Sequence, residues 1–207
     1  MKTPFRFAVV SLAIALAPSA AFADADAKKD AAPPKMTAEQ KAMMEAFARA
    51  GAPGAAHARM AKMAGSYDLE LKSWEKAGSE PTVEKGTATR KMTLDGRVLV
   101  EMVDSKVYGQ PFQGHGMHGF DNVTGKHWAT WNDSMSTGVM VSEGDCDDKG
   151  TCSFTGSWND PITKAKTTAH MKSRWSDAST EVFEMHGPGP DGNEFKMMEI
   201  TYRKRPN

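Results

Sequence analysis

The sequence predicts a mainly β protein in which a single antiparallel up-and-down barrel of about eight to ten strands follows a short helical segment. Three observations lead to this prediction. Apolar and polar residues alternate with a period of two from residue 64 onward, turn residues recur at short intervals, and no helical period intervenes. An open meander of this length would expose two edges, and closure into a barrel removes them.

The chain begins with residues typical of a bacterial export signal. Lys2 and Arg6 give a positive start, and residues 7–17 form an apolar run too short to span a bilayer as a mature helix. The sequence Ala-Phe-Ala then places small residues where signal peptidase requires them. We predict that residues 1–23 are a signal peptide cleaved after Ala23, and that the mature protein is periplasmic or secreted. A buried core helix is the alternative.

The charge of the expected mature chain excludes one class of partner. Removal of residues 1–23 leaves 184 residues, of which 24 are basic and 26 acidic, so the net charge is about −2. This balance lacks the basic excess of a nucleic-acid-binding protein. No later stretch is apolar enough for stable membrane insertion, and a chain of this length fits one domain.

Two segments precede the predicted barrel. Residues 24–36 are rich in Ala, Asp, Lys and Pro and lack aromatic residues, so we expect a flexible leader. Residues 37–63 are predicted to be helical, beginning with a capping-box pattern at Thr37 and Gln40. A second short helix is expected over residues 57–63.

The barrel domain is predicted over residues 64–207. Turn signals such as Asp95-Gly96 and Lys149-Gly150 separate its strands. The candidate strands cover residues 67–74, 83–92, 98–108, 112–120, 127–133, 139–146, 152–158, 167–175, 181–185 and 195–203. At this strand number, the interior is either filled by side chains or holds one small ligand.

The two cysteines are predicted to form a disulfide. Cys146 and Cys152 flank the turn-forming stretch Asp-Asp-Lys-Gly-Thr, which would bring them opposite each other across a hairpin. An oxidising compartment favours the bond. A redox-active pair is the alternative, but the spacing is not C-x-x-C and only Lys149 supplies a nearby positive charge.

Four stretches of the chain carry a family resemblance. They read MAGSYDLELKSW, YGQPFQGHGMHGFDNVTGK, WATWNDSMSTGVMVSEG and GPDGNEFKMMEITYRK. In these stretches the chain resembles the bacterial family catalogued as domain of unknown function 1579, over roughly Ala61 to Lys204. That family has no established activity, so the resemblance implies no chemistry.

A looser similarity concerns the first strand. Gly65-Ser66-Tyr67 is similar to the Gly-x-Trp start of lipocalin-like barrels, in which a late basic residue packs over the aromatic ring. This similarity implies that Arg203 packs over Tyr67. The chain has Tyr in place of Trp, and an analogy of fold does not license a function.

Histidine and methionine side chains suggest a metal site. His115, Met117, His118 and His127 offer imidazole and thioether groups that suit copper. The spacing argues against this hypothesis, because His115 and His118 are three residues apart and point to opposite faces of a regular strand. We therefore predict no metal and no cofactor. A haem held by a single barrel histidine is the alternative form of the metal hypothesis.

A ligand site is predicted near one predicted strand end. Trp131 and Asp133 share a strand face by the period-two rule, and Ser136 and Thr137 follow in the turn. Apolar walls with a few oriented polar groups are typical of small-molecule pockets. The alternative is that Trp131 fills the barrel and Asp133 caps the turn by accepting backbone N–H bonds.

Carboxylates within strands could perform acid–base chemistry. Glu101, Glu143 and Glu199 lie in candidate strands, but nothing in their spacing shows that they converge. By alternation Glu199 aligns with Phe195, Met197 and Arg203, which favours an inward direction and pairing with a cation there. Carboxylates exposed on the strands are the more ordinary alternative. No catalytic, nucleotide-binding or metalloprotease motif is present.

These observations favour a non-catalytic protein that binds one small apolar or amphipathic molecule in the barrel, with Trp131, Asp133, Ser136, Thr137 and Glu199 as binding residues. Two alternatives stay open. One is an enzyme with carboxylates at the barrel mouth, and the other is a structural or interaction protein with a filled core. The sequence leaves the oligomeric state open.

Overall fold

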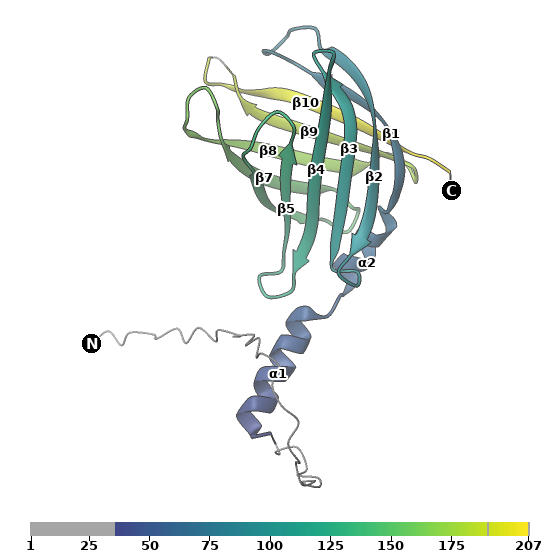
Figure 1. The fold of residues 1–207 in the computed structure, drawn as a ribbon, viewed down its shortest axis with the longest axis vertical. Coiled ribbons are helices and arrows are strands. Elements are labelled where there is room, and N and C mark those ends of the chain that lie inside the picture. The colour runs from purple at the N-terminus through teal and green to yellow at the C-terminus, as the bar shows by residue number, and fades with distance from the viewer. Residues whose placement is uncertain (1–35, 190, 207) are drawn as a thin grey trace, which may run out of the picture. The chain divides into compact units, whose positions relative to one another are not determined.

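Ten antiparallel strands close into a barrel in the computed structural model, which describes residues 36–189 and 191–206 (Figure 1). Each strand pairs with its neighbours in the sequence, and the last strand pairs with the first. The up-and-down barrel predicted from the period-two pattern is therefore confirmed. The expected signal peptide and residues 24–35 of the expected leader lie outside the described residues.

All ten candidate strands are present, and their ends differ from the predicted ones by three residues or fewer. The strands are β1 (Gly65–Ser73), β2 (Thr82–Thr93), β3 (Val98–Val107), β4 (Gln110–Asp121), β5 (Lys126–Asp133), β6 (Met140–Cys146), β7 (Cys152–Asn159), β8 (Lys166–Trp175), β9 (Thr180–Pro188) and β10 (Glu194–Lys204).

Two helices precede the barrel within the predicted helical segment. α1 (Ala38–Gly51) has no buried residue, whereas α2 (Ala55–Lys62) buries Ala56, His57 and Met60. The second helix contacts β2, β3 and β4. Its first turn is held by the Gly54 N–H, which donates to Nδ1 of His57 at 3.0 Å. Burial of one helix face against three strands fixes α2 to the barrel.

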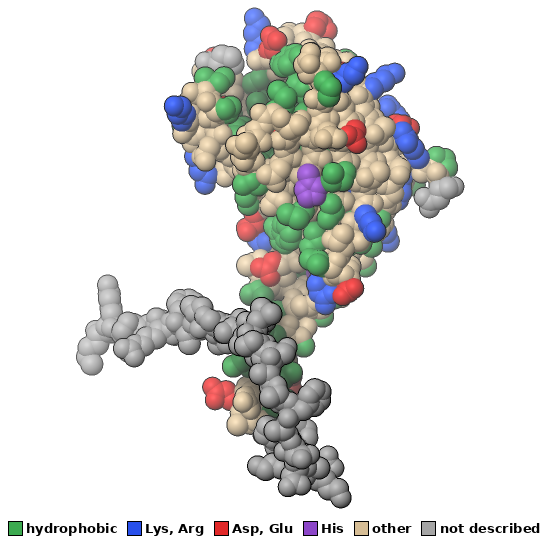
Figure 2. All heavy atoms as spheres, in the orientation of Figure 1, with side chains coloured by type: hydrophobic (Ala, Val, Ile, Leu, Met, Phe, Trp, Pro, Cys, Tyr) green, Lys and Arg blue, Asp and Glu red, His purple; other side chains and the backbone are tan. Residues whose placement is uncertain are grey.

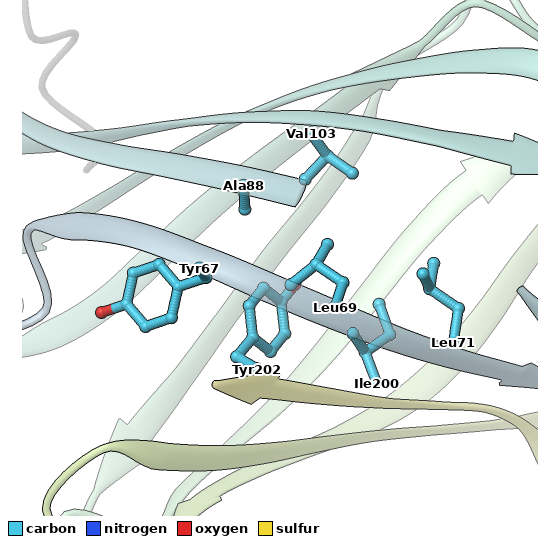
Figure 3. Close-up of a cluster of buried hydrophobic side chains, with 7 residues drawn as sticks. All are labelled: Tyr67, Leu69, Leu71, Ala88, Val103, Ile200 and Tyr202. Atoms are coloured by element: carbon cyan, nitrogen blue, oxygen red, sulfur yellow. The ribbon is translucent and has the colours of Figure 1, made fainter. Parts of the chain in front are cut away.

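The main hydrophobic cluster lies where β1 meets its two neighbours (Figure 3). Alternate residues of β1 point inward, because the pleat sends successive side chains to opposite faces. They meet inward residues of β2, β3 and β10, and the buried members are Tyr67, Leu69, Leu71, Ala88, Val103, Ile200 and Tyr202. The main cluster of buried apolar side chains thus lies at the seam that closes the barrel.

A β-bulge interrupts β10. The register with β9 shifts between Lys196 and Met198. Met197 faces inward, since a Cβ built on Gly187 would lie 2.5 Å from its sulfur, and Met198 also packs against the core. Two successive residues therefore face the same way, and the alternation that holds before Met197 is inverted after it.

The predicted disulfide is present. Cys146 and Cys152 are directly opposite each other at the ends of β6 and β7 and are bonded. The intervening turn is closed by Asp147, whose Oδ1 accepts the N–H groups of Lys149 and Thr151 at 2.9 and 2.8 Å. The bond therefore closes a hairpin that its own turn residues already shape.

Within the described part of the chain, no helix is long and apolar enough to span a membrane. Basic and acidic side chains are interspersed over the face of the barrel shown in Figure 2.

Candidate functional site

The inner face of the barrel carries large apolar side chains that keep part of their surface exposed. Five of them pack against the hydrophobic cluster, and they come from β4, β5, β8, β9 and β10. They are Phe112, Trp131, Trp175, Phe183 and Met198. Close-packed interiors leave little of such side chains in contact with solvent. At these positions the inner face is therefore apolar and in part accessible to solvent.

Small residues face inward along β5 to β8. Ala129, Ser142, Gly156 and Ala169 are consecutive partners across β5 to β8. Methionine side chains lie over them: a Cβ built on Gly156 would lie 2.6 Å from Cε of Met171. Because methionine is unbranched and polarisable, this wall can adapt to ligands of different shape.

Trp131 and Asp133 are brought together as predicted. The indole Nε1–H of Trp131 donates to Oδ2 of Asp133 at 3.0 Å, and Oδ1 of Asp133 accepts the Met135 N–H at 2.9 Å. The ring lies against the backbone of β4, where a Cβ on Gly114 would be 2.3 Å from Cζ2 of Trp131. Asp133 thus both orients the indole and caps the turn, and only glycine at 114 allows this approach.

Ser136 and Thr137 do not join them. Both residues are exposed in the turn after β5, and the Ser136 hydroxyl accepts the Gly138 N–H at 3.0 Å. Ser136 therefore shapes the turn rather than lining the interior.

The expectation that Glu199 points inward is wrong. Glu199 lies on the outer face, where it accepts a hydrogen bond from Nζ of Lys196 at 2.6 Å and lies 3.7 Å from Nζ of Lys72. The bond from Lys196 lowers the pKa of Glu199. The bulge at Met197 explains the error, because it inverts the alternation from which the direction of Glu199 was inferred.

The position over Tyr67 that the lipocalin similarity implied for Arg203 is also wrong. This residue is exposed, and the guanidinium over the Tyr67 ring belongs to Arg90. The Cζ atom of Arg90 lies 4.8 Å from the centroid of Tyr67 and 4.3 Å from that of Tyr202. The two rings meet edge to face, with centroids 6.0 Å apart. A basic residue does pack over the first-strand aromatic, but it comes from β2.

Arg90 is the centre of a buried ion cluster. Its Nε donates to Oε1 of Glu101 at 2.9 Å, and its Nη1 donates to Oε2 of Glu181 at 2.5 Å. The hydroxyl of Ser173 donates to the other oxygen of Glu181. All three charged side chains are 4% exposed. Buried charges of this kind persist only when paired, and here one cation serves two anions.

His118 connects this cluster with the apolar wall. Its Nε2 lies 3.6 Å from Oε2 of Glu101, and its side chain is 34% exposed. A Cβ built on Gly116 would lie 3.4 Å from Nε2 of His118 and 3.3 Å from Cε3 of Trp131. The imidazole and the indole therefore border the same point of the inner surface.

The electrostatic state of Glu101 follows from these contacts. Burial raises its pKa, but the attraction of Arg90 and the contact with His118 outweigh burial and hold the pKa at about 2. Burial raises the pKa of the Tyr202 hydroxyl well above its ordinary value. Glu101 is thus an anion, and Tyr202 a neutral phenol, near neutral pH.

Aromatic rings gather at the end of the barrel next to α2. His57 of α2 meets Phe120 edge to face, and Phe120 meets His127 with centroids 4.9 Å apart. Burial, followed by the charge of Arg59, lowers the pKa of His127. These rings therefore connect α2 with the inner face of β4 and β5.

The histidines proposed for copper lie as the spacing predicted. His115 pairs with Asn132 on the outer face, and His118 pairs with Ala129 on the inner face. Among residues 36–189 and 191–206, no three His, Cys, Asp or Glu side chains are grouped closely enough to hold a metal ion.

The three strand carboxylates considered for catalysis do not converge. Glu101 is buried with Arg90, whereas Glu143 is exposed and Glu199 lies on the outer face. An open hollow of about 600 Å³ does cross β6 to β9, and its wall includes Glu143, His170 and His186. None of the predicted binding residues lines it.

Sequence reasoning missed Arg90, Glu181 and Ser173. One signal was available, because Glu101 interrupts the apolar run Val98 to Val103. A carboxylate in such a run needs a buried cation. Arg90 lies opposite Glu101 on the neighbouring strand, but Glu181 is 91 positions from Arg90, and only closure of the barrel brings β2 and β9 together.

Sequential strand order, antiparallel pairing and a closed seam define the protein as an up-and-down β-barrel with a charged cluster inside. The chain belongs to a family described as proteins of unknown function, DUF1579, whose model matches residues 52–204. No curated protein matches the chain in sequence.

A solved structure supports the fold. The chain is similar to Rv2717c from M. tuberculosis, with a TM-score of 0.58, 10% identity, and coverage of 75% of this chain and 100% of that one. At this identity the similarity concerns the fold alone. A redesigned β-barrel matches with a TM-score of 0.39 and 9% identity over 71% of this chain and 95% of the designed one.

Proposed function

We propose that the protein binds one small apolar or amphipathic molecule inside the barrel, without transforming it, in the periplasm or outside the cell. The observation that carries the proposal is the partial exposure of five large apolar side chains that face inward. Pockets for small molecules combine such walls with a few oriented polar groups. Here one polar group is Asp133, which accepts the indole N–H of Trp131. The other is His118, whose Nε2 lies 3.6 Å from Oε2 of Glu101.

Two further features support binding over catalysis. The candidate carboxylates Glu101, Glu143 and Glu199 do not share a site, and Glu101 is fully engaged by Arg90 and His118. The methionine side chains over Gly156 and Gly187 supply an adaptable wall without reactive groups.

The tryptophans of β5 provide a matched test. Trp131 faces inward, whereas Trp128 lies on the outer face against Gly119, where a Cβ would be 2.3 Å from its ring. Trp131→Ala should weaken binding of the neutral dye Nile red by about tenfold or more, because it removes a large apolar contact. Trp128→Ala should leave binding unchanged. Fluorescence titration measures both.

Urea unfolding of the same variants tests whether Trp131 fills a core. Retained cooperative unfolding of Trp131→Ala with lost dye binding supports the proposal. Equal dye binding by both variants, or loss of folding by Trp131→Ala alone, would refute it. Native mass spectrometry of protein purified from the periplasm then identifies any molecule already bound.

A further inference from the structure

The charged side chains on the inner face are unequally divided between the two signs. Among the described strands, four carboxylates and two cations face inward. Glu101 and Glu181 are buried in the ion cluster. Glu84 lies opposite Leu71 in the register of β1 and β2, and therefore faces inward as Leu71 does. Asp133 accepts the indole hydrogen bond of Trp131, whose ring faces inward. The cations are Arg90 and Lys204. With the histidines neutral, the inner face carries an excess of negative charge.

Neither cation is available to an anionic ligand. Arg90 donates to Glu101 and Glu181, and the rings of Tyr67 and Tyr202 lie near its guanidinium. Lys204 faces the α2 end, where its Nζ donates to the backbone carbonyl of Lys62 at 2.9 Å. A ligand carboxylate would enter a region of negative potential without gaining a cationic partner.

The imidazole of His118 lies on the inner face, is partly exposed, and supplies a hydrogen-bond acceptor there. The carboxylate of Glu101, 3.6 Å from Nε2, favours the tautomer with its hydrogen on Nε2. Nδ1 then carries a lone pair. The imidazole borders Trp131 across Gly116, so a molecule that contacts the indole reaches the imidazole as well. Its polar end must donate a hydrogen bond to be satisfied there.

We propose that the barrel interior selects amphipathic molecules whose polar end is cationic or donates hydrogen bonds, with a primary amine as the preferred class, and rejects carboxylates. This inference rests on the proposed binding function and specifies its ligand class. The excess of inward carboxylates attracts the ammonium group, and His118 accepts its hydrogen bond. The apolar wall around Trp131 receives the hydrocarbon part in every case.

Three molecules with the same hydrocarbon tail separate the two proposals. Dodecylamine, dodecanol and dodecanoate compete with Nile red for the full-length mature protein at about pH 7, where the amine is a cation and the acid an anion. We expect dodecylamine to bind at least about tenfold more tightly than dodecanoate, with dodecanol between them. Concentrations stay below those at which the molecules form micelles.

The outcomes are distinct. Equal competition by all three, or tighter binding of dodecanoate, overturns the selectivity and leaves the binding function in place. Absence of Nile red binding and of competition overturns both proposals. The wild-type protein suffices for these comparisons, so they do not depend on the folding of any variant.

Two variants locate the charge that is responsible. Glu101→Gln removes one inward negative charge, and Glu143→Gln removes one from the exposed outer face of β6. We expect the preference for dodecylamine over dodecanoate to fall several-fold in Glu101→Gln and to stay unchanged in Glu143→Gln. An equal fall in both, or a fall in neither, would contradict selection by the interior.

Discussion

The ion pair of Arg90 and Glu101 makes the stability of the barrel depend on pH. The pKa of Glu101 is about 2 in the folded protein, and its ordinary value is 4.5. Because the folded state holds this carboxylate ionised, its stabilisation is fully present above the unfolded pKa and is lost as pH falls from about 4.5 toward 2. Stability therefore falls with falling pH, as expected for a carboxylate whose pKa is lower in the folded state than in the unfolded state.

Acid titration of unfolding measures this contribution. Between about pH 5 and pH 2, the free energy of unfolding of the wild type should fall by about 3 kcal/mol more than that of Glu101→Gln, which has no carboxylate to protonate there. Urea denaturation at a series of pH values gives both curves. Parallel curves would show that Glu101 is not held ionised by the fold.

For single residues, the sequence predicts those contacts that depend on one strand alone. The shared face of Trp131 and Asp133 follows from the period of two, and their hydrogen bond is local. The partnership of Arg90 with Glu181 spans 91 positions and depends on strand register, which no local pattern contains.

At the scale of elements, the bulge in β10 shows where alternation stops being a guide. Glu199 and Arg203 were both expected to share the face of Met197, and both lie after the bulge. The residues Lys196, Met197 and Met198 include no glycine or proline that would have signalled an irregularity. Strand existence was therefore predictable from this segment, whereas the direction of its side chains was not.

The β6–β7 hairpin carries a prediction of its own. Replacing both Cys146 and Cys152 by Ser should lower the free energy of unfolding by about 2 kcal/mol, because the bond closes a short loop. The fold should persist, since Asp147 still holds the turn through the Lys149 and Thr151 N–H groups. Urea denaturation of the variant and of the oxidised wild type measures the difference.

A thiol assay checks the same hairpin directly. The purified oxidised protein should show no free thiol until it is reduced. Two titratable thiols in that protein would contradict the disulfide, and the Ser variant supplies the zero for the assay.

For the whole molecule, ten strands and their closure were predictable because short alternating runs are separated by clear turns. A meander of such strands has few ways to protect its edges, so the barrel follows from general rules. Which residues fill the interior does not follow, because packing joins side chains from β4, β5, β8, β9 and β10.

Export can be tested on the intact chain. Cleavage after Ala23 predicts a periplasmic protein whose first residue is Asp24, as measured by intact mass and amino-terminal sequencing. Ala23→Arg should block cleavage and leave the longer chain, because the peptidase pocket accepts only small residues there. A periplasmic protein that still begins with Met1 would contradict the prediction.

The seam between β1 and β10 has a consequence for how the chain folds. Tyr67 lies opposite Lys204, and the cluster joins Leu69 and Leu71 of the first strand with Ile200 and Tyr202 of the last. Synthesis proceeds from the amino terminus, so the first strand is made long before its partner exists. Contacts between such distant segments slow folding. The apolar face of β1 is therefore fully buried only after residues 194–204 have been made.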